Sequence, residues 1–277
     1  MANPVILSDN RFADAVPTAT DTTAGYDVRN VTDLRDFTLW QAASPGTKYI
    51  TVDCGAAKEA DTLAFLGHNF FSAGAAVSLE KSADNVTWEP VIAPFTPPSD
   101  HAQLVLFPGS GFLDTGTSSF TDTSTSGFER PAMRYWRIKI VTASIAPRLA
   151  VLLLGVRMTF PFPPDAPHTP DAESVMAQPA ISKGGHLLGV AVTYAPLSVT
   201  AAFSNPARSW VFNSFDPWWL AYGRYLKSFF WAWDLDTFPQ AVLFLRFKAS
   251  YVKQYPLSCL LTVDKLTLDM EGIAEVP

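Results

Sequence analysis

The sequence predicts an all-β protein, and three observations support this class. Short segments alternate between polar and apolar residues with a period of two, most clearly Tyr49–Gly55 and Arg134–Val141. This alternation is typical of strands with one buried face. The chain also has 22 prolines, and its connecting segments are rich in Ser, Thr and Gly. Both features favour a fold with many turns rather than long helices.

Composition restricts the class of protein and of partner. The chain has 277 residues, of which 48% are hydrophobic and 17% charged, as expected for a folded protein with a large core. This length suits two domains or one large β domain. The net charge is −6 and no run of like charges occurs. We therefore expect no nucleic-acid partner, because phosphate binding needs a basic patch.

No segment predicts membrane insertion or a disulfide framework. The most apolar run, Leu149–Val156, is far shorter than the roughly 20 residues of a membrane helix, so we expect a single buried strand over Leu149–Phe160. The first residues lack the pattern of a signal peptide, which predicts a soluble protein made in the cytoplasm. Cys54 and Cys259 are far apart in the sequence, and we expect both to be free, buried thiols.

A proline-rich segment divides the chain. Phe160–Pro170 contains five prolines in eleven residues, which predicts a stiff, extended connector. We therefore predict a β-sandwich over residues 1–160, with Pro4–Leu7 as a short edge strand, a linker over 161–170 and a smaller, mainly β domain over 171–277. In this second domain Asp216 and Pro217 suit the start of a helix near 217–230. Large aromatic residues recur there at helical spacing.

The sequence has no recognisable catalytic or cofactor motif. It lacks the close His and Cys pairs of a zinc site, a phosphate loop, a dinucleotide fingerprint and a nucleophile elbow. We therefore expect no enzyme activity, no cofactor and no metal. Loop residues form a candidate ligand site whose carboxylates also suit calcium, although solvated turn residues are the simpler interpretation. This candidate ligand site comprises Asn30, Asp33, Trp40, Asp114 and Asp122.

The segment from Trp210 to Trp233 contains five tryptophans. Such a cluster suits a platform on which sugars stack. At helical spacing, however, it more often forms a core or an interface between subunits. We therefore predict an assembly surface made by Trp210, Trp218, Trp219, Tyr222 and Tyr225.

Four motifs in order resemble the discoidin, or coagulation-factor C-type, domain, which is an eight-stranded jelly-roll β-sandwich. They span about 110 residues within the first 160. The family's "N-L-x-D-G … T-x-W", "W-I-x-V-D-L-G", "S-x-D-G-x-x-W" and "A-R-Y-V-R-I" patterns are similar to Asn30–Asp33 with Trp40, Tyr49–Gly55, Ser82–Trp88 and Arg134–Ile138. Leu152–Val156 resembles the closing strand. Members bind ligands through variable loops, so the resemblance carries over no ligand residue to this chain.

The C-terminal part resembles a segment of bacteriophage and prophage tail proteins. In that segment an aromatic helix precedes a "P-F-x-x-A-W" strand, here Phe229–Asp234, and further strands end near Met270–Gly272. The resemblance covers about 70 residues. It implies a component of a tail tip or baseplate, assembled in the host cytoplasm and located in the virion.

The leading hypothesis is a non-enzymatic structural component of a bacteriophage tail tip or baseplate, with the β-sandwich as a decoration or a partner- or receptor-binding module. Its partners would be other phage tail proteins, further copies in a ring or trimer, and a host-surface glycan. We expect no nucleic-acid and no membrane partner. The alternative is a carbohydrate-binding protein, and a glycan-processing enzyme is a third hypothesis.

Overall fold

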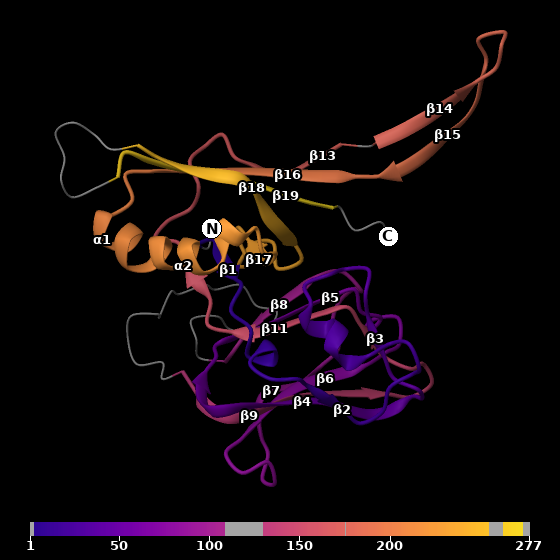
Figure 1. Ribbon diagram of the computed structural model, residues 1–277, viewed down its shortest axis with the longest axis vertical. Helices are drawn as coiled ribbons and strands as arrows, with labels where there is room; N and C mark the ends of the chain where they lie inside the picture. The colour runs from indigo at the N-terminus through magenta and orange to yellow at the C-terminus, as the bar shows by residue number, and fades with distance from the viewer. Residues whose placement is uncertain (1–2, 109–129, 175, 255–262, 274–277) are drawn as a thin grey trace.

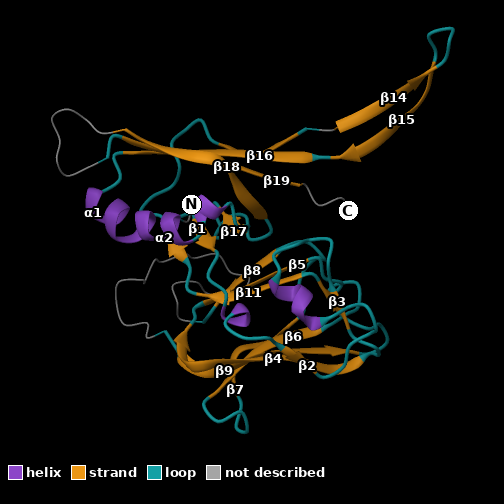
Figure 2. Cartoon of the chain, viewed as in Figure 1, coloured by secondary structure: helices purple, strands orange, loops and turns teal. Residues whose placement is uncertain are grey.

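In the computed structural model, which describes residues 3–108, 130–174, 176–254 and 263–273, the chain forms antiparallel sheets joined by loops and short helices (Figure 2). A β-sandwich lies at one end, and a larger sheet with a helical layer lies at the other (Figure 1). The predicted all-β class and the N-terminal β-sandwich are confirmed.

The β-sandwich consists of a five-stranded and a three-stranded sheet. The five-stranded sheet has the order β2-β4-β9-β6-β7, and the three-stranded sheet has the order β11-β5-β8. The strands of the first are β2 (Thr18–Ala19), β4 (Gly46–Glu59), β9 (Ala132–Thr142), β6 (Ala76–Ser82) and β7 (Glu89–Phe95). Those of the second are β11 (Val151–Gly155), β5 (Thr62–Leu66) and β8 (Gln103–Leu106). A separate pair, β3 (Trp40–Gln41) and β10 (Arg148–Leu149), lies beside them.

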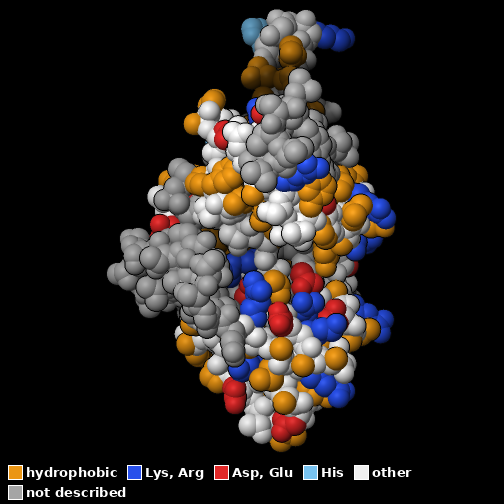
Figure 3. Space-filling model, turned by 90° about the vertical axis from the view of Figure 1, so that its left-hand side faces the viewer, with side chains coloured by type: hydrophobic (Ala, Val, Ile, Leu, Met, Phe, Trp, Pro, Cys, Tyr) orange, Lys and Arg blue, Asp and Glu red, His pale blue; other side chains and the backbone are white. Residues whose placement is uncertain are grey.

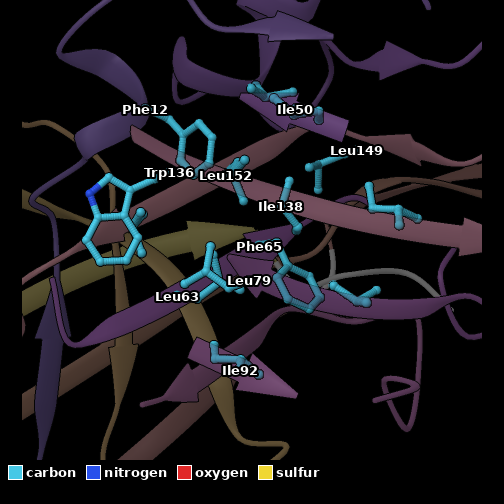
Figure 4. Close-up of a cluster of buried hydrophobic side chains, with 14 of the residues drawn as sticks. Phe12, Ile50, Leu63, Phe65, Leu79, Ile92, Trp136, Ile138, Leu149 and Leu152 are labelled. Atoms are coloured by element: carbon cyan, nitrogen blue, oxygen red, sulfur yellow. The ribbon is translucent and has the colours of Figure 1, made fainter. Parts of the chain in front are cut away.

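The period-two patterns predict the buried faces of β4 and β9 correctly. Ile50 and Val52 of β4 and Trp136 and Ile138 of β9 are completely or almost completely buried. They pack between the two sheets together with residues of β5, β6 and β11 (Figure 4). The intervening polar residues lie on the outer face, which agrees with strands that are buried on one side only.

The expected single strand over Leu149–Phe160 is wrong. This run forms three short strands, and each belongs to a different sheet: β10 pairs with β3, β11 with β5, and β12 (Met158–Thr159) with β1 (Val5–Leu7). Gly155 lies at the end of β11, where a Cβ atom would stand 2.4 Å from the backbone oxygen of Asp9. Only glycine allows this close approach between the two segments, and the division of the run follows from its three different partner strands.

The second part is built on a seven-stranded sheet of order β12-β1-β17-β18-β19-β16-β13. Its remaining strands are β17 (Phe229–Ala232), β18 (Val242–Gln254), β19 (Lys265–Ile273), β16 (Pro196–Ser204) and β13 (Thr169–Glu173). The predicted edge strand at Pro4–Leu7 is thus an inner strand, because β1 lies between β12 and β17. The start of the chain therefore contributes to the sheet of the C-terminal part, while the division into residues 1–160, 161–170 and 171–277 stays a prediction.

A continuous apolar cluster joins the sandwich to this sheet. Leu63 and Phe65 of β5 point into the sandwich, whereas Ala64 and Leu66 point toward the large sheet. All five residues of β11 are buried, because one face of the strand packs in the sandwich core and the other packs toward the large sheet. We call the contact the seam cluster; it consists of Val5, Leu7, Ala64, Leu66, Ala102, Leu104, Leu106, Ala150, Val151, Leu153, Phe230, Ala232, Leu235 and Val242. Apolar burial of this kind is the main favourable term in domain packing.

The opposite face of the large sheet is covered by a helical layer that lies earlier in the chain than the predicted 217–230. It runs through α1 (Arg208–Trp210), the π-helical turn η3 (Val211–Phe215) and α2 (Asp216–Ala221), followed by the 3-10 turn η4 (Gly223–Tyr225). Asp216 therefore lies inside the helical segment and does not cap its start. Two further 3-10 turns, η1 (Arg11–Ala13) and η2 (Val28–Thr32), belong to the sandwich loops.

Candidate interaction surfaces

The predicted ligand loop from Asn30 to Trp40 is fixed by its own polar side chains. The Asn30 amide donates a hydrogen bond to the carbonyl oxygen of Leu39 (2.9 Å). The Asp33 carboxylate accepts from the backbone N–H of Arg35 (2.9 Å) and from the hydroxyl of Thr38 (2.7 Å). These bonds are typical of turns closed by Asx side chains. The loop is therefore preorganised, and Asn30 and Asp33 stabilise its shape; their contact with a ligand stays a prediction.

Trp40 does not present a face to solvent, which corrects its assignment to the ligand site. Its side chain is completely buried in the sandwich core. Its Nε1 donates to the carbonyl oxygen of Asp21 and to the hydroxyl of Thr22, both at 3.2 Å. The exposed aromatic residue of this loop is Phe37, which is 77% exposed. Sequence patterns missed Phe37 because a single aromatic residue between polar neighbours has no periodic signal.

The other two residues of the candidate ligand site, Asp114 and Asp122, lie outside the described residues. Within the described ranges, no group of three His, Cys, Asp or Glu side chains is placed to hold a metal ion. Burial raises the pKa of the Cys54 thiol to about 11, so this thiol is protonated and a poor nucleophile near neutral pH. Cys259 is also outside the described residues.

The outer face of the five-stranded sheet carries an aromatic and charged cluster. The Arg137 guanidinium lies between two rings, 4.3 Å from the Tyr49 centroid and 4.0 Å from the Trp88 centroid. Its Nε donates to a Glu80 carboxylate oxygen at 2.5 Å, and Lys139 lies 3.8 Å from the same carboxylate group. These partners engage one another by cation–π contacts and ion pairs. The cluster therefore stabilises the sheet surface.

The tryptophans of the predicted assembly surface pack mainly against the large sheet. Trp210 contacts Phe160 (centroids 5.2 Å apart), and Trp218 and Trp219 contact Phe247 at 5.6 and 4.9 Å. All three are only partly exposed. They hold the helical layer on the sheet, so a large part of the predicted surface serves as core.

The two tyrosines of that surface have different environments. The hydroxyl of Tyr222 donates to Asp9 at 3.3 Å, and burial raises its pKa. Tyr222 therefore ties the helical layer to the start of the chain. Tyr225 is 57% exposed and is the one member of the predicted set that is largely open to solvent. Its role in assembly stays a prediction.

A shallow pocket lies between β12 and the helical layer. Its volume is about 260 Å³, and it is lined by Arg157, Met158, Thr159, Trp210, Ser214 and Trp218. This volume is below the range of about 300–1,000 Å³ typical of small-molecule sites. The Arg157 guanidinium lies 3.7 Å from the buried carboxylate of Asp61. The pocket alone does not define a ligand site.

A β-hairpin carries much of the exposed apolar surface of the described residues. Strands β14 (Met176–Ile181) and β15 (Leu187–Tyr194) pair only with each other among the described strands and extend away from the body (Figure 1). We call this hairpin the arm. Its large apolar side chains are 50–71% exposed: Met176, Ile181, Leu187, Leu188 and Val190. A space-filling view shows hydrophobic side chains along the arm, with a basic and a His side chain at its tip (Figure 3).

Comparison with known proteins gives structural similarity only. No family model and no curated protein matches the sequence. A chitosan-binding module from a chitosanase/glucanase of Paenibacillus sp. IK-5 is 15% identical, with 53% of this chain and 98% of the module covered and a TM-score of 0.40. Two further similar structures are from Clostridium perfringens. The first, CpGH89CBM32-6, is 13% identical; the match covers 53% of this chain and 98% of that module, with a TM-score of 0.39. The second is CpGH89CBM32-5.

The structure of CpGH89CBM32-5, solved in complex with GalNAc-beta-1,3-galactose, is 12% identical; the match covers 53% of this chain and 99% of that module, with a TM-score of 0.40. At these values the likeness carries no argument about what this chain does. Within the described part of the chain, none of the helices has the length and hydropathy needed to cross a membrane.

Proposed function

We propose that this chain is a non-enzymatic subunit of a larger protein assembly, and that the arm joins it to its neighbours. The observation that carries the proposal is the exposure of every residue of β14 and of the first four residues of β15. A two-stranded hairpin alone is marginally stable in water, and exposed apolar patches of this kind mark interaction sites. A covering protein partner would satisfy both requirements.

The place of this subunit in a bacteriophage tail tip or baseplate, and so in the virion, rests on the resemblance of the C-terminal segment to tail proteins. In that setting the large sheet and arm would form the assembly part. The β-sandwich, joined to it through the seam cluster, would project as a decoration or a receptor-binding module. Burial of apolar surface between subunits supplies the binding free energy, and no covalent chemistry is involved.

The test is incorporation into the native assembly. Particles are purified from cells that produce the complete set of neighbouring gene products, with either the unchanged chain or a chain in which residues 177–190 are replaced by a short Gly-Ser turn. We expect the unchanged chain to co-purify with the particles at a fixed ratio and the shortened chain to be lost. Equal incorporation of the shortened chain, or no particle-bound chain in either case, would contradict the proposal.

A second candidate function is carbohydrate binding by the β-sandwich, and the Phe37 loop favours it. An exposed ring on a loop fixed by Asp33 and Thr38 is suited to stack on a sugar, and Arg35, whose Cζ lies 6.0 Å from the ring centroid, provides hydrogen-bond donors beside it. Rigid aromatic anchors bind with a small loss of side-chain entropy. A glycan of the host surface would be the partner.

A glycan array tests this candidate with a matched pair of variants. Phe37→Ala removes the ring of the loop, whereas Phe71→Ala removes another exposed ring, 53% exposed, on a different loop. We expect saturable glycan binding that is lost only in Phe37→Ala. Binding that is absent from the unchanged chain, or insensitive to Phe37→Ala, would exclude the Phe37 loop as the site.

A further inference from the structure

We propose that His68 is a pH switch of the β-sandwich: its neutral ring holds the loop 67–75 in place, and its protonated ring turns to Asp100 and releases this loop. The proposal concerns the sandwich alone and goes beyond the assembly function. It rests on a buried histidine whose two ring nitrogens both have partners, with a carboxylate oxygen just beyond hydrogen-bond distance.

Two backbone groups hold His68 in one neutral form. Its side chain is completely buried. Its Nε2 lies 2.9 Å from the carbonyl oxygen of His101, and the backbone N–H of Phe70 donates to its Nδ1 at 3.2 Å. A carbonyl oxygen only accepts and an amide N–H only donates. The proton of the neutral ring is therefore on Nε2, and the lone pair of Nδ1 holds Phe70.

The contact between His68 and Phe70 fixes the path of the loop 67–75. The carbonyl oxygen of Phe70 accepts from the backbone N–H of Ala75 at 2.7 Å, so Phe70 is bonded on both its N–H and its carbonyl side. The next residue, Phe71, has a ring that is 53% exposed. A change at Phe70 therefore alters the surface of the sandwich.

A second proton on the His68 ring reverses the role of Nδ1. The added proton must go to Nδ1, which then becomes a donor that faces the N–H of Phe70. Two donors cannot bond to each other, and a buried donor without an acceptor is destabilising. Oδ1 of Asp100 lies 3.9 Å from Nδ1. A bond between charged groups has a length of about 2.8 Å, so a movement of about 1 Å gives the protonated ring a new partner.

Asp100 is suited to this role because it already holds the loop from its other side. Its Oδ1 accepts from the backbone N–H groups of Phe71 at 2.8 Å and Ser72 at 3.2 Å. Burial opposes its ionisation, but the bonds from Ser72 and Phe71 hold the pKa of Asp100 below its usual value. Asp100 is thus a carboxylate when His68 gains its proton. A bond to His68 then competes with the two bonds that position Phe71.

Few charged groups surround the ring in the described part of the chain. Apart from His68, β5 and the loop 67–75 contain no titratable side chain. The rings of Phe65 and Phe70 pack against His68, with centroids 4.8 and 4.7 Å away. Three charged or titratable groups lie on the neighbouring elements: Asp100 and His101, which face the ring, and Arg148, which is exposed.

The pH at which the switch operates follows from these surroundings. Burial, opposed by the bond to His101 and by the charge of Asp100, lowers the pKa of His68 to about 4 from 6.5. Closer contact with Asp100 stabilises the protonated ring and raises this pKa. We therefore expect the loop to rearrange at a pH between these two values.

Amide NMR spectra of the 15N-labelled full-length chain, recorded from about pH 7 to about pH 4, test the switch. We expect the amide signals of Phe70, Phe71 and Ser72 to shift together with the ring nitrogens of His68. Their hydrogen-exchange protection factors should fall at least about tenfold across the same transition. The amides of β4 and β11 should keep their shifts and their protection, because the rearrangement is local.

Three variants identify the groups that act. His68→Gln should abolish the transition. Asp100→Asn keeps an oxygen that accepts from Phe71 and Ser72 but removes the charge, so the transition midpoint should fall by at least about 0.5 pH unit, or about threefold in proton concentration. His186→Gln removes an exposed histidine of the arm and should leave the transition unchanged.

Three results would overturn the inference. If the amides of β4 and β11 lose protection at the same pH as Phe70, the acid response is unfolding of the sandwich. If the His68 ring titrates while the loop amides stay unchanged, Nδ1 does not hold the loop. If Asp100→Asn has the midpoint of the unchanged chain, Asp100 does not receive the protonated ring.

Discussion

Strands β11 and β15 are both apolar segments of the sequence, yet their environments are opposite. β11 (Val151–Gly155) is buried at all five residues, because the sandwich core covers one face and the large sheet covers the other. β15 (Leu187–Tyr194) is exposed at each of its first four residues. An apolar strand shows that a covering surface is required. It does not show whether this surface belongs to the same chain.

The largest expected effect comes from truncating an equivalent leucine in each strand. Leu153→Ala leaves a cavity in the seam cluster and should lower the free energy of unfolding by about 3 kcal/mol. Leu187→Ala on the arm should change it by less than about 0.5 kcal/mol. Urea denaturation of dilute samples measures both. Similar losses for the two variants would show that the arm is covered within a single chain.

Acid provides a second way to weaken the sandwich while leaving the arm unaffected. Burial lowers the pKa of His68 to about 4 from 6.5; its Nε2 lies 2.9 Å from the carbonyl oxygen of His101, and its ring stacks on Phe70. Between these pKa values the unfolded chain binds a proton that the folded chain does not, so stability falls as the pH drops from 6.5 toward 4. The loss is about 3 kcal/mol at its greatest.

Denaturation midpoints measured in steps across this pH range test the effect of His68. His68→Gln keeps an amide that can donate to His101 and should remove most of the pH dependence. His186→Gln, at the exposed tip of the arm, should leave it unchanged. A constant midpoint between pH 6.5 and 4 in the unchanged chain would contradict the role assigned to His68.

Two glycines provide a smaller, matched contrast. A Cβ atom at Gly223 would stand 2.4 Å from the Trp219 ring, whereas nothing lies within 4 Å of one at Gly189. Gly223→Ala should therefore displace Trp219 from Phe247 and lower the stability by about 1–2 kcal/mol. Gly189→Ala on the arm should be neutral or slightly stabilising. Thermal unfolding measures both changes in stability, and tryptophan fluorescence reports the position of Trp219. A fluorescence spectrum of Gly223→Ala that is identical to that of the unchanged chain would rule out the displacement.

The sequence predicted what depends on local periodicity. The buried faces of β4 and β9 follow from alternation within each strand. The burial of Trp40 could not be predicted from local periodicity. Its indole N–H donates hydrogen bonds to Asp21 and Thr22, which lie at least 18 residues earlier in the chain. Without that pairing, a Trp in a polar loop is equally consistent with ligand stacking and with burial.

Long-range pairing also explains the remaining errors. The run from Leu149 to Phe160 has one uniform apolar pattern, but its three parts pair with Gln41 and Trp40, with β5, and with the start of the chain. The helical layer begins at Arg208, earlier than predicted, because the aromatic side chains of this segment pack on the large sheet. The π-helical turn η3 has no sequence signature, so capping residues alone do not predict it. The exposure of Phe37 and of the arm did not follow from the sequence, because exposure is a property of the fold.

The smallest expected effect concerns the free energy of local opening, which should be much lower for the arm than for β11. The strands β14 and β15 are each held by one partner strand, and the residues of β14 and Leu187–Val190 of β15 are exposed, so local opening should require only about 0–2 kcal/mol. Amides of β11 should exchange only on global unfolding. Hydrogen exchange of a dilute sample of the purified chain measures both. An arm as protected as β11 in that sample would mean that the arm is covered within its own chain.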